Sequence, residues 1–251
     1  MANYRSAFSP FRLLGIAATM ASAACVPTEP PAVGAPEAAA LAATPPSAPR
    51  STAYLDLLRR SGIEMAIPPT GKFVIVNIPS YELVALQDGE PVLRSRVVVG
   101  KPATPTPELT ASMVAIRFNP DWTPTPWMVR NEGLHYMPPG PQNPLGRMMF
   151  GLDDDGLIYL HDTNEKQLFN RGQRALSHGC IRVQQARALA AWSLGVAEKA
   201  IDSMVARGST YAVPVPEDIR VALVYSTRFP DERGEIRSYP NIYLHQTAQA
   251  R

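Results

Sequence analysis

Short hydrophobic runs rich in β-branched residues recur along the chain, and turn-forming sequences separate them. Runs of this length and composition predict β-strands. The first three are separated by Pro79-Ser80 and Asp88-Gly89, which are typical of hairpin turns, so we expect an antiparallel meander. The predicted strands cover residues 73–78, 82–86, 94–99, 113–118, 157–161, 219–227 and 235–239. The last two would form a closing hairpin around a turn at 231–234.

Helical patterns are fewer and lie mostly in the second half of the chain. They cover residues 54–60, 184–194 and 198–206, and each ends near a glycine. A proline-rich loop is expected from 119 to 146, and ordered loops of that length usually have a function. Strands followed by helices and further strands predict a mainly β domain with a few helices, of the α+β class. We expect a β-sandwich or open barrel with the helices packed at one side.

The first 24 residues have the pattern of an export signal. Two arginines precede an apolar stretch at 13–20 that is too short to span a bilayer, and small residues follow it. The tetrapeptide at 22–25, Ser-Ala-Ala-Cys, resembles the lipobox of bacterial lipoproteins, which predicts lipidation of Cys25. Ordinary cleavage beside the small residues is the alternative. We favour the lipoprotein, because export otherwise gives Cys25 no evident role.

The segment at 25–53 is expected to be a disordered linker. From 26 to 50 it holds seven prolines and eight alanines without any periodicity. One folded domain is expected at 54–245, followed by a short tail at 246–251. The formal net charge is +2, and it falls to zero once the two arginines of the export signal are left out. Nucleic acid is therefore not an expected partner.

Cys180 and Cys25 are the two cysteines of the chain. A single cysteine in an exported domain is a candidate nucleophile, and a buried inert thiol is the alternative. A thiol nucleophile needs a base, for which His161 and His178 are candidates. We favour His161, because it arrives from a separate strand, whereas a side chain two positions before the thiol usually points alongside it.

Gly179 allows a tight turn directly before the thiol. Successive N–H groups in such a turn can converge on the oxyanion of an acyl-transfer intermediate. A zinc site is the rival interpretation, but zinc needs three or four ligands, and only His161, His178 and Cys180 stand out. We therefore expect neither a metal nor another cofactor.

The residues around the thiol resemble the signature of the L,D-transpeptidases with a YkuD-type catalytic domain. That signature is matched by His161 and, after fifteen intervening residues, by the run Ser-His-Gly-Cys-Ile-Arg at 177–182. Flanking segments at 118–122, 138–146, 158–163, 213–215 and 241–243 are similar to those of the larger Gram-negative members. Those members carry a peptidoglycan-binding module and a substantial lid. Here we expect no such module, and only thirteen residues separate Trp127 from Pro141 where the lid would be.

The resemblance implies roles for the central residues. Cys180 would be the nucleophile and His161 the base, and the main-chain carbonyl of Asp162 would orient the imidazole. The N–H groups of Gly179 and Cys180, helped by Tyr159, would bind the oxyanion.

The resemblance also implies roles for the surrounding residues. Ser177 and His178 would support the turn. Arg182 would either bind the carboxylates of the substrate or form an internal salt bridge. Tyr159 and Trp122 would contact the substrate.

The reaction implied by the resemblance is peptidoglycan L,D-transpeptidation, a step of cell-wall biogenesis that affects cell shape. Cys180 would attack a tetrapeptide stem, release D-alanine and pass the acyl group to an amine acceptor. A 3→3 crosslink is the expected product. Anchoring of a protein amine, D-amino-acid exchange and hydrolysis are the alternatives.

The expected partners follow from that reaction. They are peptidoglycan stem peptides, a protein amine acceptor if anchoring is the outcome, and the outer or inner membrane through the lipid anchor. The expected location is the periplasm of a Gram-negative bacterium. Two rival functions are a non-catalytic wall-binding lipoprotein and a general cysteine protease or thioesterase. The first is disfavoured because both the nucleophile and the base are present.

Overall fold

The computed structural model describes residues 53–154 and 158–243, all within one compact unit, Pro46–Arg251. The expected signal peptide at 1–24, the lipidation site Cys25, the linker apart from its last residue and the tail at 246–251 lie outside the described residues. Within the described ranges, none of the helices combines the length and the apolar character needed to cross a membrane.

The first three strands form the predicted antiparallel meander. They are β1 (Lys72–Asn77), β2 (Glu82–Gln87) and β3 (Glu90–Gly100). Asp88 and Gly89 connect β2 to β3 with φ angles of 53° and 81°. Two successive positive φ angles are the geometry of a type I′ turn, whose twist matches that of the strands it joins. The Asp-Gly sequence therefore sets this hairpin.

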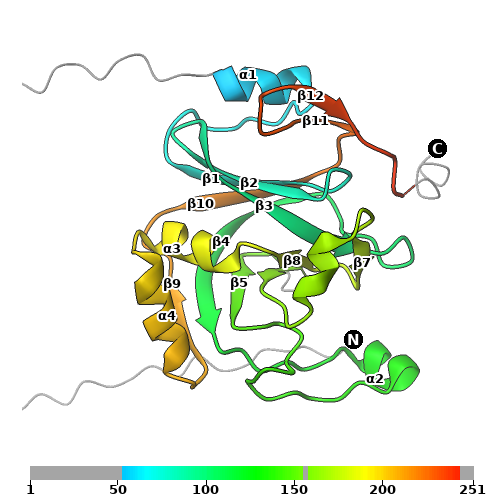
Figure 1. Cartoon of the computed structure of the whole chain (residues 1–251), viewed down its shortest axis with the longest axis vertical. Coiled ribbons are helices and arrows are strands. Elements are labelled where there is room, and N and C mark those ends of the chain that lie inside the picture. Colours follow the sequence, from blue (N-terminus) through cyan, green and yellow to red (C-terminus); the bar gives the residue numbers. More distant parts are fainter. Residues whose placement is uncertain (1–52, 155–157, 244–251) are drawn as a thin grey trace, which may run out of the picture. The chain divides into compact units, whose positions relative to one another are not determined.

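These strands belong to a ten-stranded sheet that closes into a barrel-like ring (Figure 1). The others are β4 (Leu109–Phe118), β5 (Met148–Leu152), β6 (Leu160–His161), β7 (Ala175–Ser177), β8 (Ile181–Val183), β9 (Tyr211–Pro214) and β10 (Ile219–Val224). From β10 the order runs β1-β2-β3-β8-β6-β5-β4, and β10 closes the ring by pairing parallel with β1 and antiparallel with β4. The predicted mainly β class is confirmed.

The closing hairpin differs from its prediction. The strand expected to end at 227 is divided: β10 ends at Val224 inside the large sheet, and a separate hairpin pairs β11 (Arg228–Pro230) with β12 (Ile236–Ser238). The predicted turn at 231–234 joins these two short strands. Both faces of β10 are buried, with Val221 in one core cluster and Ala222 in another, so the strand fits the sheet interior and not an edge hairpin.

Several elements were not predicted. The proline-rich loop contains the helix α2 (Pro126–Glu132), and strands β5, β7, β8 and β9 lie where none was expected. A short 3₁₀ helix, η1 (Lys166–Asn170), follows β6. The strand expected at 157–161 is limited, in its described part, to Leu160–His161. The segment Met-Met-Phe-Gly-Leu of β5 contains no β-branched residue, which is why composition did not reveal it.

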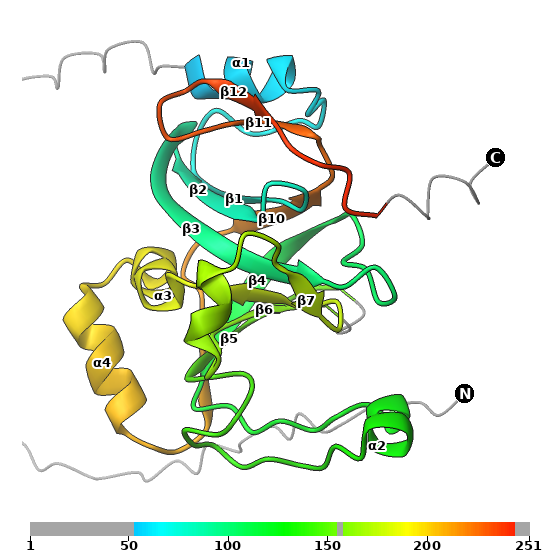
Figure 2. The same ribbon diagram turned by 45° about the vertical axis from the view of Figure 1, so that its right-hand side comes forward.

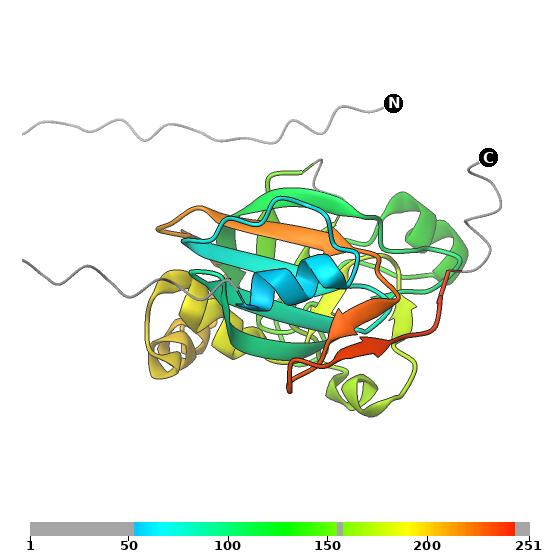
Figure 3. The ribbon, with the colours of Figure 1, turned by 90° about the horizontal axis from the view of Figure 1, so that it is seen from above.

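Helices cover the sheet from two directions. Helix α1 (Ala53–Arg60) lies across it, drawn in blue in Figure 3, and packs on Phe73 and Ile75 of β1. Helices α3 (Ala186–Leu194) and α4 (Glu198–Ala206) lie together at one side, as predicted, while α2 lies apart from them (Figure 2). The observed ends of α1, α3 and α4 agree with the predicted helices to within two residues.

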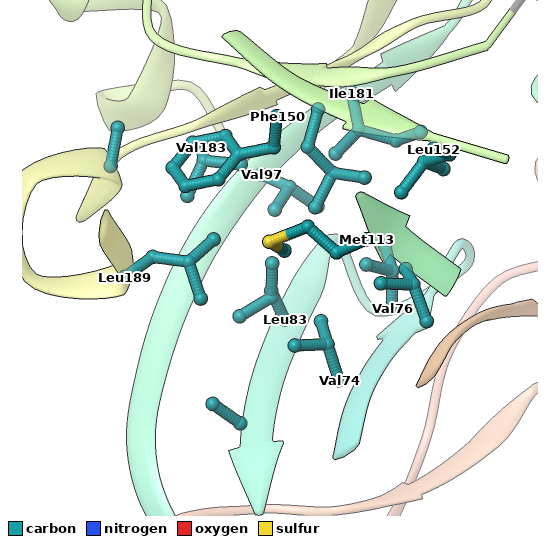
Figure 4. Packing of buried hydrophobic residues seen from close by; sticks show 14 of the residues in the cluster. Val74, Val76, Leu83, Val97, Met113, Phe150, Leu152, Ile181, Val183 and Leu189 are labelled. Atoms are coloured by element: carbon teal, nitrogen blue, oxygen red, sulfur yellow. The ribbon is translucent and has the colours of Figure 1, made fainter. Parts of the chain in front are cut away.

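The main core lies inside the closed sheet. Val74 and Val76, which alternate along β1 with the residues facing α1, point into this core. Figure 4 shows them meeting Met113 of β4, Phe150 of β5 and Ile181 of β8. Because Ile181 is fully buried, this packing fixes the start of β8, where the sequence places the candidate nucleophile.

Candidate active site

Most of the site residues predicted from the sequence line one small cavity of about 70 Å³; Asp162 and Gly179 are not part of its wall. Its walls are Trp122, Met128, Pro144, Leu145, Tyr159, His161, Ser177, His178, Cys180 and Arg182. A larger cavity of about 420 Å³ lies elsewhere and is lined by Arg94, Arg96 and Arg174 among others, with no cysteine or histidine. The small cavity is therefore the candidate site, since it joins a thiol to an imidazole.

Two adjacent parallel strands bring the thiol and the imidazole together. Strands β6 and β8 pair so that His161 lies in register with Arg182, and Cys180 directly precedes β8. The N–H of Ile181 also donates to the carbonyl of Tyr159 at 3.1 Å. The segment that carries Tyr159 and His161 is thus fixed beside the segment that carries Cys180, as a base and a nucleophile on separate strands require.

The imidazole of His161 is held in one orientation. Its side chain is buried, with 5% exposure, and Nδ1 lies 2.5 Å from the main-chain oxygen of Asp162. A carbonyl only accepts, so Nδ1 carries the proton and donates, which leaves Nε2 as a lone-pair acceptor. Burial lowers the pKa of His161 to about 3; the charges of Arg182 and Lys166 act in the same direction, and the Asp162 carbonyl opposes them. The resting imidazole is therefore neutral.

The thiol of Cys180 is neutral at rest for a related reason. Burial raises its pKa, and hydrogen bonding with Tyr159 opposes that rise. Burial likewise raises the pKa of Tyr159, and the nearby Cys180 adds to the effect, while a hydrogen bond from Trp122 lowers it. Tyr159 thus keeps its phenolic proton and can donate a hydrogen bond within the cavity.

A compact turn holds the thiol. Ser177 Oγ accepts from the N–H of Gly179 at 3.1 Å and donates to the carbonyl of Cys180 at 2.7 Å. Gly179 adopts φ of 123°, a conformation that residues with side chains rarely take. This differs from the expectation that the Gly179 N–H binds the oxyanion, because that N–H is used inside the turn. The N–H of Cys180 is the other main-chain donor that the resemblance implies for the oxyanion.

His178 lines the cavity, but its imidazole is engaged outside the thiol pair. Its Nε2 lies 2.8 Å from Glu132 Oε1, at the end of α2, and 3.5 Å from Lys101 Nζ. These contacts join three segments, the loop after β3, helix α2 and the turn at 177–180. The position fits the expected supporting role of His178 better than that of the base.

Charged residues around the site form internal pairs. Arg182 pairs with Glu165, so one of its two expected uses, the internal salt bridge, is present. The buried carboxylate of Asp162 accepts from the N–H of Arg147 at 2.9 Å and pairs with Lys166. Sequence reasoning missed this use of the Asp162 side chain. The spacing of four residues to Lys166 was the only available signal.

Two further findings concern the surroundings of the site. Within residues 53–154 and 158–243, no three His, Cys, Asp or Glu side chains are placed to hold a metal ion. Trp122 lies in an isolated antiparallel bridge with Met137, which closes the base of the segment carrying α2. This bridge holds the Trp122 side chain at the cavity wall, next to Tyr159.

Known proteins share features with this chain. Residues 71–216, more than half of the chain, match the family model of the L,D-transpeptidase catalytic domain, YkuD. A Haemophilus influenzae protein provisionally named an L,D-transpeptidase is 29% identical over 221 residues; the match covers 70% of this chain but only 45% of that relative.

Solved structures were found at lower identity. The catalytic domain of the E. faecium L,D-transpeptidase acylated by ertapenem is 18% identical with a TM-score of 0.39, and the match covers 62% of this chain and 98% of that one. The L,D-transpeptidase from Mycobacterium smegmatis is 18% identical with a TM-score of 0.37, covering 61% of this chain and 58% of that one.

Proposed function

Because the chain belongs to the family of L,D-transpeptidase (YkuD) catalytic domains, we propose that it is a cysteine acyltransferase acting on peptidoglycan stem peptides. Cys180 is the nucleophile and His161 the base. The donor is a tetrapeptide stem, from which the terminal D-alanine is released. The acyl group passes to an amine, and a 3→3 crosslink is the first candidate product.

One observation carries this proposal: a thiol, an oriented neutral imidazole and a phenol line the same cavity. The Asp162 carbonyl binds Nδ1 of His161, so Nε2 is the nitrogen available to take a proton. Because both Cys180 and His161 are neutral at rest, the proton moves as the sulfur attacks and not beforehand. An ion pair formed in advance would be opposed by the burial of both groups.

In the first half-reaction, His161 Nε2 takes the proton from Cys180 Sγ while the sulfur bonds to the carbonyl carbon of the third stem residue. The carbonyl oxygen becomes an oxyanion, which the N–H of Cys180 and the phenol of Tyr159 stabilise. The intermediate then breaks its bond to the nitrogen of D-alanine, and that nitrogen takes the proton from His161. A thioester on Cys180 remains.

In the second half-reaction, an amine attacks the thioester and His161 takes its proton. The new amide forms as the carbon–sulfur bond breaks, and the proton returns to Cys180. A diaminopimelate side-chain amine gives the 3→3 crosslink. A protein amine, a free D-amino acid or water would give anchoring, exchange or hydrolysis through the same intermediate.

The proposed place of action is the periplasm of a Gram-negative cell, with the domain tethered by a lipid on Cys25. The export-signal pattern at 1–24 and the proline-rich composition at 26–50 support it. The tether would reach the outer or inner membrane and keep the domain near the wall. Non-catalytic wall binding is less well supported, because the side chains of an acyl-transfer site line one cavity.

The proposal is tested by intact-mass spectrometry of the purified protein incubated with disaccharide-tetrapeptide. The wild type should gain one disaccharide-tripeptide acyl group and release D-alanine. Cys180→Ala should gain nothing, and His161→Ala should acylate about 10²- to 10⁴-fold more slowly. His178→Ala is the matched control and should lose less. Acylation of Cys180→Ala, or acylation by ordinary L-peptides in place of muropeptides, would overturn the proposal.

A further inference from the structure

A buried threonine, Thr106, lies directly behind the catalytic turn. Its hydroxyl donates to the carbonyl oxygen of Gly179 at 2.6 Å and accepts from the N–H of Gly100 at 2.8 Å. The side chain is only 3% exposed, so water does not compete for these bonds. The hydroxyl has one donor and one acceptor partner, and its rotation is therefore fixed.

Tyr243, close to the end of the described chain, completes this contact. Its hydroxyl accepts from the N–H of Thr106 at 3.1 Å and donates to the carbonyl of Gly100 at 2.7 Å. The ring is buried and stacks on Tyr225, with 5.5 Å between the ring centroids. The hydroxyl of Tyr225 also accepts from the N–H of Tyr243 at 3.0 Å. The C-terminal segment thus holds the loop that carries Thr106.

These contacts determine the direction of one peptide plane. The bond between Gly179 and Cys180 is trans, so its carbonyl oxygen and its N–H point to opposite sides. Thr106 binds the carbonyl on the buried side, and the N–H of Cys180 is therefore directed away from the interior. Cys180 lies on the cavity wall, so that direction is the side on which a substrate carbonyl would lie.

The hydrogen bonds of Ser177 do not by themselves fix the orientation of this peptide. Ser177 binds the N–H of Gly179 and the carbonyl of Cys180, on either side of it, but not the Gly179 carbonyl. Gly179 has no side chain to restrict its backbone, and its φ of 123° is accessible to glycine together with many others. The hydroxyl of Thr106 is a buried side-chain contact that selects one orientation of this peptide.

We propose that Thr106 and Tyr243 are positioning residues, which direct the N–H of Cys180 at the oxyanion formed during acylation. The inference rests on the acyl-transfer function proposed above. Neither residue touches the substrate. Both act through the Gly179–Cys180 peptide, and the electrostatic stabilisation of the oxyanion depends on their hydrogen bonds.

Two reactions of the same thiol separate this role from a merely structural one. Acylation by a carbapenem forms an oxyanion, whereas alkylation by iodoacetamide displaces iodide from carbon and forms none. Thr106→Val keeps the shape of the side chain and removes its hydroxyl. It should slow acylation by about 10- to 10²-fold, below the loss typical of removing an oxyanion donor outright, and leave alkylation within about twofold of wild type.

Matched variants make the result specific. Thr106→Ser restores the hydroxyl and should restore acylation to within about threefold, and Tyr243→Phe should slow acylation selectively while Thr106 remains. Thr104→Val is the control, because Thr104 donates to the Ser177 carbonyl, which also accepts from the Lys101 N–H. It should change neither reaction by more than about threefold.

Each outcome decides the proposal. A selective loss of acylation in Thr106→Val and Tyr243→Phe, rescued by serine, supports it. Equal losses in both reactions, an unchanged acylation rate, or a loss in Thr104→Val as large as in Thr106→Val would overturn it. If the wild type alkylates but accepts no acyl group from either the carbapenem or disaccharide-tetrapeptide, the proposed function itself fails and this inference falls with it.

Discussion

The buried imidazole of His161 should make the stability of the domain depend on pH. Burial, reinforced by the charge of Arg182, lowers its pKa from 6.5 to about 3. Between these values the unfolded chain binds a proton that the folded chain does not, so protonation favours unfolding. The neutral imidazole contributes fully to the free energy of unfolding above pH 6.5. That contribution is lost as the pH falls from 6.5 toward 3. At about pH 4.5 the free energy of unfolding should have fallen by about 3 kcal/mol.

Urea unfolding of wild type and His161→Gln, at a series of pH values between about 7 and 4.5, tests this magnitude. Glutamine does not titrate, and its amide can still donate to the Asp162 carbonyl. The free energy of unfolding of the wild type should therefore fall about 2–3 kcal/mol further than that of the variant. Cys180→Ala is the control and should keep the wild-type slope, because it retains the imidazole. Parallel curves for wild type and His161→Gln would refute the neutral resting site.

Two further predictions concern other parts of the chain. A Cβ at Gly146 would lie 2.5 Å from Asp162 Oδ2 at a φ of 63°, so Gly146→Ala should lower the free energy of unfolding by more than its control Gly133→Ala, where φ is 65° and no atom lies within 4 Å. Equal losses in thermal unfolding would contradict this reasoning. A fatty-acid label should mark the wild type but not Cys25→Ala, and deleting most of 26–50 should reduce wall modification in cells but not activity on soluble muropeptides. Wall modification by a soluble Cys25→Ala protein at the wild-type level would refute the tether.

The meander could be predicted because local sequence determines it. The β-branched runs and the Asp88-Gly89 turn act between neighbouring strands. The closure of the sheet could not, since β10 pairs with strands more than a hundred residues away, and hydrophobicity alone does not choose a partner. Helix α2 was missed because prolines surround it. Thr125 followed by Pro126 is nevertheless a favourable helix start, since the threonine caps and proline suits the first turn.

The candidate site was predictable to the extent that its chemistry is local. The spacing of His161 and Cys180 indicated a base and a nucleophile, and the structure places both on one cavity. The use of the Gly179 N–H depends on the rotamer of Ser177, which spacing does not specify. Thr106 is separated from Gly179 by 73 residues, and only the tertiary fold brings them together.

The volume of the cavity limits what the site itself can hold. At about 70 Å³ it is much smaller than the arginine-lined cavity of about 420 Å³, and it does not enclose a whole tetrapeptide. In the proposed reaction, the reacting carbonyl and its neighbours would enter beside Cys180, and the rest of the stem would lie along the outer surface. Contacts inside the cavity would then contribute little to the affinity for the stem peptide. Holding the domain close to its polymer would raise the effective substrate concentration without any new contact. A shallow site and the proposed proline-rich tether would act together, because the site would supply reactivity and the tether would supply proximity.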